Sequence, residues 1–343
     1  MTSISCGAPN SYLGTLGRKG LIFKSGRNLI DLDHSLLEAA DFSDVVFCKN
    51  CYFLAHPSSN AIFKFSVDSL EFQRSLENIT FNKVNFYTKN LRASADQRSL
   101  IVNSSDTALF VIEVEHLDLL EEFPGEPRIL IISNRTGSRV SCHEPIFDDK
   151  LLTINKEGLF VVYQVDFLSF LNYEELEVFQ VDLKDSAQED YFYMSICERS
   201  ELCALLICSK RLNFTASRIL VFRLNNKEGG EDILTLSSQI DLRSQFLGHY
   251  YSICFSRYFG KKIFICGYSM SGGGFGYSFH LKNDGKIFQC FKGSGLYSVR
   301  NRCSKLVRNG EEVWGMLWSG SVIKFSFTNT PIFDGPKLRL HYI

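Results

Sequence analysis

The chain has little of what helical or nucleic-acid-binding proteins need. Only 4 Met and 7 Pro occur in 343 residues, and no long run repeats apolar residues at helical spacing. The nearest candidate, residues 34–40 (HSLLEAA), covers about two turns. The formal net charge of −1 gives no electrostatic drive toward nucleic acid or an anionic membrane surface. We therefore expect no nucleic-acid partner.

Segments for export or membrane insertion are also missing. The first residues, MTSISCGAPNSYLG, lack the basic and apolar regions of a secretory signal. The apolar run LCALLIC (202–208) is far shorter than the roughly 20 residues of a spanning helix. The 11 Cys are odd in number and often lie inside apolar runs, which is typical of buried thiols in a reducing compartment. The sequence predicts a soluble cytoplasmic (intracellular) protein with no membrane span.

Aromatic residues are abundant instead. The chain has 30 Phe and 14 Tyr, with 45% hydrophobic and 22% charged residues overall. Aromatic side chains suit half-buried pleated surfaces, so this composition favours a globular protein built from strands.

One stretch shows how such strands are arranged. Residues 98–123 read RSLIVNSSDTALFVIEVEHLDLLEEF. The pattern predicts strands at 100–103, 108–114 and 117–123, separated by polar turns. A further strand at 84–88 precedes them, which gives four antiparallel strands in one small sheet.

Similar text recurs along the chain. FVIEV (110–114) matches VVYQV (161–165) after a shift of 51 (161 − 110). Ser195-Ile196-Cys197 recurs as Ser252-Ile253-Cys254 after a shift of 57 (252 − 195), and the same shift carries Phe222 onto Phe279. The repeat recurs roughly every 45–60 residues and carries one four-stranded sheet, which cannot bury both of its faces by itself. Sheets packed face to face around an axis cover one another, so the repeat predicts a β-propeller.

A family resemblance supports this interpretation. SADQRSLIVNSSDTALFVIEVEHLDLLEEF (94–123) resembles a blade of the WD40-like or YVTN-like β-propeller repeat superfamily, in which a small-residue turn precedes a strand, a polar turn and a second strand. LAHPSSNAIFKFSV (54–67) is similar to the middle hairpin of such a blade. The typical Trp-Asp dipeptide is absent, and Gly248-His249 is the single Gly-His. The resemblance implies a disc whose faces bind peptides or protein domains.

We predict an all-β fold with about seven four-stranded blades, and six as the alternative. Residues 1–19 are an N-terminal extension, and residues 20–343 form a single propeller domain. A strand at 337–342 pairs with the first blade and closes the ring through the two chain ends. Residues 166–177 are an insertion with room for a helical turn. The predicted blades are 20–40 (incomplete), 42–77, 84–124, 128–181, 191–241, 250–291 and 297–327.

The sharpest chemical motif is Cys48-Lys49-Asn50-Cys51. A Cys-x-x-Cys pair can supply half of a four-ligand zinc site, but the sequence contains no second such pair. We interpret Cys48 and Cys51 as the ends of two apolar strands around a tight turn. Whether they bind metal stays open, and we commit to no metal or cofactor.

Other polar clusters are also interpreted as structural. Cys142 and His143 are adjacent on an extended segment and point to opposite faces, so they cannot easily meet beside Glu144. Asp148-Asp149 is interpreted as a turn entering a strand. The glycines at 272–276 lead into a strand and not into the helix that a phosphate loop needs. The seven His have no metal-ligand spacing, while Glu144, Asp190 and Asp241 fall where acids can line a central channel.

Two functions remain. The first, which we favour, is a non-catalytic scaffold that docks proteins or peptides on a propeller face. The second is a metal-dependent hydrolase or lactonase with acids and His at the central channel. We expect no enzyme activity and no catalytic residues; the partner and the oligomeric state cannot be read from the sequence.

Overall fold

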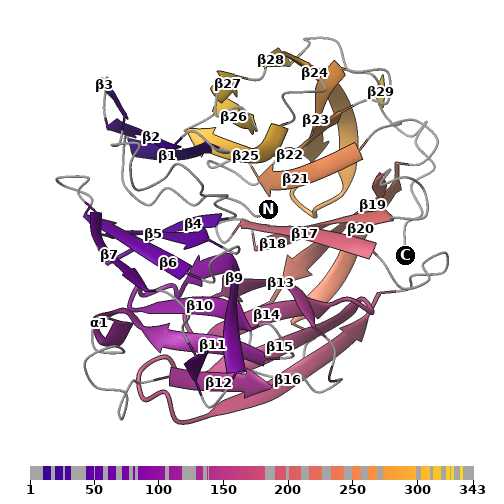
Figure 1. The fold of residues 1–343 in the computed structure, drawn as a ribbon. Coiled ribbons are helices and arrows are strands. Elements are labelled where there is room, and N and C mark those ends of the chain that lie inside the picture. The colour runs from indigo at the N-terminus through magenta and orange to yellow at the C-terminus, as the bar shows by residue number, and fades with distance from the viewer. Residues whose placement is uncertain are drawn as a thin grey trace. The chain divides into compact units, whose positions relative to one another are not determined.

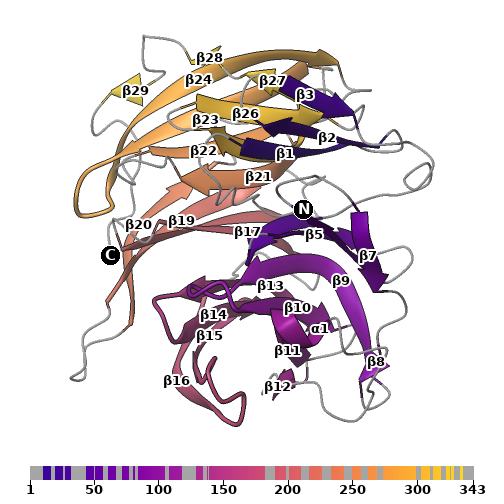
Figure 2. The same ribbon diagram turned by 90° about the vertical axis from the view of Figure 1, so that its left-hand side faces the viewer.

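The fold is taken from a computed structural model that describes most of the strand-forming segments. The described residues are 11–16, 20–25, 28–31, 44–49, 51–56, 61–66, 72–76, 80–81, 84–104, 108–117, 129–133, 137, 139–181, 190–197, 201–209, 216–225, 233–242, 249–255, 262–268, 273–298, 303–309, 312–317, 322–324, 326–327 and 333–334. They are almost entirely strand (Figures 1 and 2). The chain divides into an N-terminal unit, Ile4–Asp182, and a C-terminal unit, Leu183–Ile343 with Met1–Ser3.

The N-terminal unit contains four antiparallel sheets, and within each sheet consecutive strands pair in chain order. The sheets comprise β1 (Ser11–Leu16), β2 (Gly20–Ser25) and β3 (Asn28–Asp31); β4 (Asp44–Cys48), β5 (Cys51–His56), β6 (Ala61–Ser66) and β7 (Phe72–Leu76); β8 (Thr80–Phe81), β9 (Val84–Ala93), β10 (Ser99–Ser104), β11 (Ala108–Glu113) and β12 (Ile129–Ser133); and β13 (Val140–Ile146), β14 (Lys150–Asn155), β15 (Leu159–Val165) and β16 (Tyr173–Gln180). A short helix, α1 (Val114–Leu117), follows β11.

The C-terminal unit contains three more antiparallel sheets. They comprise β17 (Asp190–Cys197), β18 (Leu202–Ser209), β19 (Ala216–Leu224) and β20 (Leu234–Asp241); β21 (His249–Phe255), β22 (Lys262–Tyr268), β23 (Gly273–Leu281) and β24 (Ile287–Ser298), with β28 (Ser326–Phe327) and β29 (Phe333–Asp334) on the outer side of β24; and β25 (Cys303–Asn309), β26 (Glu312–Leu317) and β27 (Val322–Lys324). The described residues of both units thus form seven sheets.

The same irregularity recurs in four of the seven sheets, which is typical of a repeated unit. In four sheets the fourth strand carries one extra residue, a β-bulge, opposite the third strand. The bulged positions are Gln73, Leu176, Ser237 and Phe288, in β7, β16, β20 and β24. The predicted repeat is borne out in the same way: Ser195 and Ser252 both lie in first strands, and Phe222 and Phe279 both lie in third strands.

Neighbouring sheets within a unit pack face to face. In β10, Leu100 and Val102 pack in one core with the β4–β7 sheet, while Ile101 packs in another with the β13–β16 sheet. Successive strand residues point to opposite faces, so one sheet is covered on both sides. In the C-terminal unit a single core joins the β17–β20 and β21–β24 sheets. Six Phe side chains are fully buried in the described residues: Phe53, Phe110, Phe160, Phe222, Phe255 and Phe279.

Polar side chains connect adjacent sheets. Phe255 N–H donates to Ser195 Oγ at 3.2 Å, which joins β21 to β17. Asn103 Nδ2 donates to Val140 O at 3.3 Å. Arg92 on β9 and Glu144 on β13 form a buried ion pair, with Nη2 and Oε1 2.6 Å apart.

Two predicted blade boundaries are wrong. Leu117 ends helix α1 and does not begin a strand, and residues 118–128 lie outside the described residues. The strand that pairs with β11 is β12, which the sequence analysis had assigned to the next blade. The Ile-rich segment ILIIS has the higher strand propensity, whereas the 117–123 segment carries three acidic residues.

The described strands near the chain ends differ from the predicted blades in two places, and a third prediction is not tested. Strand β1 lies inside the predicted extension 1–19 and pairs with β2. Strand β24 continues to Ser298, and Ser326–Phe327 pair with it instead of joining β25–β27. The strand predicted to close the ring, residues 337–342, lies outside the described residues.

His280 on β23 predicts a pH dependence for the C-terminal unit. Its ring stacks on Phe291 with centroids 4.4 Å apart, and its strand partner is Lys262. Burial, and then the Lys262 ammonium, lower the pKa of His280 to about 4. The unfolded chain, with an ordinary pKa of about 6.5, binds this proton more readily. We expect the contribution of His280 to stability to be complete above pH ~6.5 and to be lost as the pH falls toward 4.

Urea unfolding at about pH 7 and about pH 4.5 measures this effect. We expect the wild type to lose more stability on acidification than the His280→Gln variant does. An equal loss in the two proteins contradicts the assignment.

Candidate functional site

The Cys48–Cys51 motif forms the predicted turn between two strands. The two residues face each other across the β4–β5 hairpin, and Cys48 is buried. Its thiol donates to Gln97 O at 2.9 Å. Burial, then the Asp96 carboxylate, raise the pKa of Cys48 to about 12. Cys48 is therefore a neutral thiol that holds the β4–β5 hairpin to the turn after β9.

The cluster around Cys142 is a packing feature of β13. Burial raises the pKa of the Cys142 thiol, and the Glu144 carboxylate raises it further. His143 Nε2 lies 3.2 Å from Ile101 O on the neighbouring sheet. Glu144 is paired with Arg92. His143 and Glu144 thus have separate partners, and nothing in this arrangement prepares Cys142 as a nucleophile.

The remaining predicted candidates do not converge. Asp190 and Asp241 lie on the first and fourth strands of one sheet, which strand spacing separates by about 14 Å. The glycines were predicted to form a loop that leads into a strand, but Gly273–Gly276 already belong to β23, and Ser271-Gly272 lie outside the described residues. Within the described ranges, no group of three or more His, Cys, Asp and Glu side chains is arranged to hold a metal ion. No helix in those ranges is long and apolar enough to cross a bilayer.

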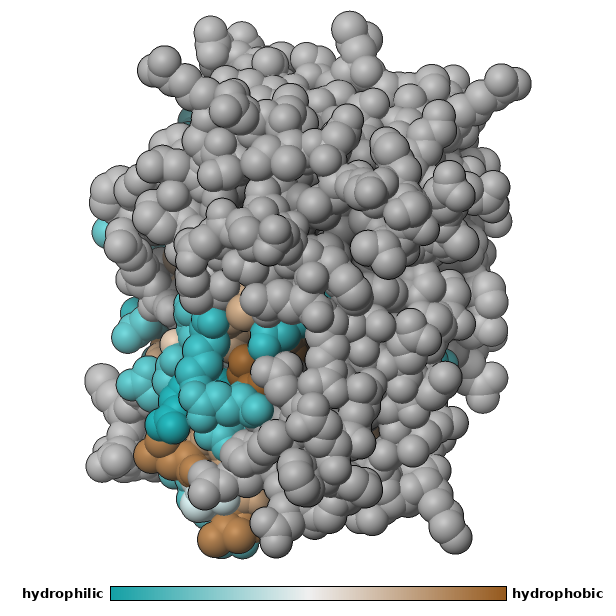
Figure 3. All heavy atoms as spheres, turned by 60° about the vertical axis from the view of Figure 1, so that its left-hand side comes forward, coloured by the Kyte–Doolittle hydropathy of each residue, from teal (hydrophilic) through white to brown (hydrophobic). Residues whose placement is uncertain are grey.

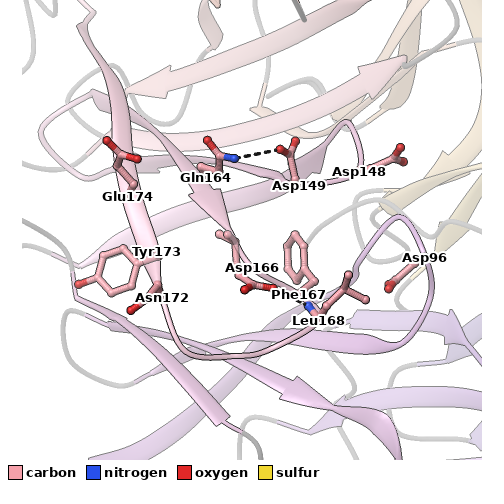
Figure 4. A pocket seen from close by; sticks show the side chains of 11 residues that line it. Asp96, Asp148, Asp149, Gln164, Asp166, Phe167, Leu168, Asn172, Tyr173 and Glu174 are labelled. Carbon is pink, nitrogen blue, oxygen red and sulfur yellow. Dashed lines mark hydrogen bonds between the residues drawn. The ribbon is translucent and has the colours of Figure 1, made fainter. Parts of the chain in front are cut away.

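The structure instead brings carboxylates together in the N-terminal unit. A groove of about 790 Å³ opens between the turn after β9, the β13–β14 turn and the segment joining β15 to β16. Of the described residues that line it, five are acidic and none is basic: Asp96, Asp148, Asp149, Asp166 and Glu174. Figure 4 shows Asp96 and Asp148 on one side of this acidic groove and Tyr173 and Glu174 on the other.

Hydrogen bonds hold two of these carboxylates in place. Asp149 accepts from Gln164 Nε2 at 3.2 Å, and Lys150 Nζ lies 3.0 Å from its other oxygen. Asp166 accepts from the Ser169 hydroxyl and from the N–H groups of Ser169 and Leu168. The Ser169 hydroxyl is the main reason that the pKa of Asp166 is lowered. Asp166 therefore stays negatively charged to lower pH than an ordinary Asp.

The segment after β15 presents two leucines to solvent. Phe167 and Phe170 are buried in the core shared with the β9–β12 sheet. The side chains of Leu168 and Leu171, in contrast, are 68% and 74% exposed. Phe170 N–H donates to Asp166 O at 3.0 Å, which is the bond of one helical turn, as the sequence predicted. Phe170 also has φ of 58°, an unusual value for a bulky residue, and such strain tends to occur at functional sites.

Apolar exposure continues along β16. The exposed large hydrophobics in the described residues are all found between positions 168 and 178: Leu168, Leu171, Tyr173, Leu176 and Val178. We call these five residues the apolar strip. In Figure 3, brown apolar and teal hydrophilic atoms of described residues lie next to one another on the surface. Contiguous apolar exposure of this kind typically marks an interaction site.

Tyr173 joins the acidic groove to the apolar strip. Its ring packs edge-on against Tyr163, with centroids 5.8 Å apart. Its hydroxyl accepts a hydrogen bond from Ser133 N–H on β12 at 3.3 Å. The side chain is thus held in position before any partner arrives, which lowers the entropic cost of binding.

The sequence predicts parts of this site but not their arrangement. The turn predicted at Asp148-Asp149 is confirmed. Of the insertion predicted at residues 166–177, residues 166–172 connect β15 to β16, but residues 173–177 belong to β16, so the prediction is wrong for them. The sequence does not show that this connection and the turn line one groove with Asp96. The spacing Phe-Leu-Ser-Phe-Leu at 167–171 was the available signal, because two Phe three residues apart can be buried together while the two Leu point away.

With these features in place, comparison with known proteins defines the fold class: the chain is a β-propeller. It is similar to the β-propeller domain of Cps50 (Swd1) from Myceliophteria thermophila, with a TM-score of 0.57 and 11% identity over 94% of this chain and 97% of that one. BamB from Moraxella catarrhalis gives a TM-score of 0.48 at 11% identity over 94% and 80% of the two chains, which is too weak to support an argument. No family model and no curated protein matches the sequence. The predicted β-propeller fold is confirmed; blade number and ring closure stay predictions.

Proposed function

We propose that this propeller is a non-catalytic scaffold that docks a partner protein on the acidic groove and the adjoining apolar strip. The observation that carries the proposal is that, among the residues whose exposure the structure describes, the exposed large hydrophobics all lie at positions 168–178, beside five carboxylates. Apolar side chains supply affinity when they are covered, and the surrounding charges select and orient the partner. Propellers are rigid supports for such surfaces.

A location inside the cell is part of the same proposal. The cysteine side chains that the structure describes are all free thiols, and most are buried. This supports a reducing compartment.

Site-specific photo-crosslinking tests the docking role. A photoreactive phenylalanine analogue at Leu171 is expected to yield a discrete crosslinked product in extract of the source cells. The same analogue at Lys156, an exposed residue of the β14–β15 turn at the other end of this sheet, is expected to yield none. Adding Glu174→Lys should suppress the product, because it reverses one charge of the groove. Equal products at Leu171 and Lys156 would show that the surface has no preferred partner.

A further inference from the structure

The loop between β15 and β16 presents two leucines to a partner. Phe167 and Phe170 anchor this loop in the core, whereas Leu168 and Leu171 are 68% and 74% exposed. Covering apolar side chains of this size is a strong driving force for association. Because both leucines lie on one loop beside the acidic groove, a single partner can cover them while it reaches into the groove.

Hydrogen bonds hold the loop in one shape. One Asp166 carboxylate oxygen accepts from the N–H groups of Leu168 and Ser169 at 3.0 and 2.9 Å. The carbonyl oxygen of Asp166 accepts from the N–H of Phe170 at 3.0 Å. The exposed leucines are therefore held in position before a partner arrives, which reduces the entropy lost on binding.

The charges beside the leucines indicate the chemistry of the partner. Among the described residues that line the groove, five are acidic and none is basic, although the net charge of the whole chain is only −1. The Lys150 ammonium, 3.0 Å from Asp149, compensates one of the five carboxylates. Asp96 and Asp148 come from two different turns and lie on the same side of the groove (Figure 4). This local concentration of negative charge is complementary to Lys or Arg side chains.

The size of the groove favours a short segment over a folded domain. Its volume of about 790 Å³ lies within the roughly 300–1,000 Å³ of pockets that enclose a ligand of drug size. Only a few residues of a chain fit into such a space. Nucleic acids and anionic lipid surfaces carry the same sign of charge as the groove and would be repelled. The occupant that fits best is a short basic segment of a protein.

We propose that the groove binds a short basic segment of the partner protein, whose Lys or Arg side chains enter the groove while a neighbouring aliphatic or aromatic side chain packs on Leu168 and Leu171. This inference rests on the proposed docking function and specifies the chemistry of the partner. Arg suits the groove best, because its planar guanidinium can bind a carboxylate through two parallel hydrogen bonds. The leucines supply affinity, and the carboxylates supply selectivity and speed of association.

Selection from a random peptide library tests the inference without assuming a sequence. Phage that display the peptides are panned on the immobilised full chain, and phage that also bind the Leu168→Ser/Leu171→Ser variant are removed. We expect the recovered peptides to be enriched in Lys or Arg next to aliphatic or aromatic residues. Recovery of no peptide, or of peptides without this basic enrichment, overturns the inference.

A charge substitution on the protein tests the same point by affinity. Asp148→Asn removes one carboxylate of the groove at an exposed position of the β13–β14 turn. The matched control is Glu157→Gln, which removes an exposed carboxylate in the β14–β15 turn at the other end of this sheet.

Fluorescence anisotropy with a labelled recovered peptide measures the two effects. We expect Asp148→Asn to weaken binding by about tenfold or more, since a hydrogen bond between charged groups is lost, and Glu157→Gln to change it by less than about twofold. Circular dichroism and melting temperature show that both variants are folded. Equal affinities of the two variants contradict the inference.

The crosslink at Leu171 distinguishes failure of this inference from failure of the docking function. A position-specific crosslink to a partner, together with peptides that lack basic residues, leaves the docking function standing and overturns only the chemistry of the segment. A crosslinked dimer of this chain shows that the occupant is a second copy, which also overturns the inference. Absence of a position-specific crosslink removes the docking function itself.

Discussion

Arg92→Met is expected to lower the free energy of unfolding by about 3–5 kcal/mol, because it leaves the Glu144 carboxylate buried without its guanidinium partner. The side chains are only 7% and 11% exposed, so water cannot replace the lost partner. The pair also connects β9 to β13, strands of two neighbouring sheets in the N-terminal unit. Urea unfolding followed by circular dichroism measures the change.

Two further variants show whether burial causes the loss. Replacing both charges, in Arg92→Met/Glu144→Leu, should restore most of the stability, since apolar residues of similar volume often replace a buried pair without cost. The matched exposed pair is Lys49–Glu115, whose side chains are 35% and 63% exposed. Glu115→Gln should change stability by less than about 1 kcal/mol. If Arg92→Met behaves like Glu115→Gln, the ion pair does not stabilise the contact between sheets.

The sequence predicted those features of the fold that depend on residues close together in the chain. Ser195-Ile196-Cys197 and Ser252-Ile253-Cys254 occupy equivalent first strands. Each sheet packs against its neighbours in the same way, so the same alternation of polar and apolar residues recurs. The two strands that flank Cys48-Lys49-Asn50-Cys51, β4 and β5, were predictable for the same reason. The local pattern was misleading after β11, where Leu117 ends α1 and the strand that pairs with β11 is β12, not the predicted strand at 117–123.

The site was less predictable because it depends on contacts between distant segments. Asp96 and Asp166 are 70 residues apart (166 − 96) and meet only once the β9–β12 and β13–β16 sheets are packed together. The Arg92–Glu144 pair spans 52 residues (144 − 92) and has no sequence motif. Which apolar residues of residues 167–171 stay exposed is decided by the core that buries Phe167 and Phe170.

The largest effect on function is expected at the two most exposed leucines. Leu168→Ser/Leu171→Ser removes apolar side chains that are 68% and 74% exposed in the free protein. Stability should be unchanged or slightly higher, since these side chains contribute little to the core. Binding should suffer strongly, because residues at the centre of an interface each contribute about 2 kcal/mol or more. Two together correspond to a loss of roughly 700-fold when their effects add, and we expect a loss of at least about a hundredfold because such effects add only in part.

The most direct test of the docking surface uses the partner protein that the Leu171 crosslink captures. Its affinity is measured for the purified wild type and for this double variant. Titration calorimetry should show at least about a hundredfold weaker binding for Leu168→Ser/Leu171→Ser, with Lys156→Ser matching the wild type and all three proteins melting alike. If the double variant binds as tightly as Lys156→Ser does, the partner docks elsewhere and the proposed surface is wrong.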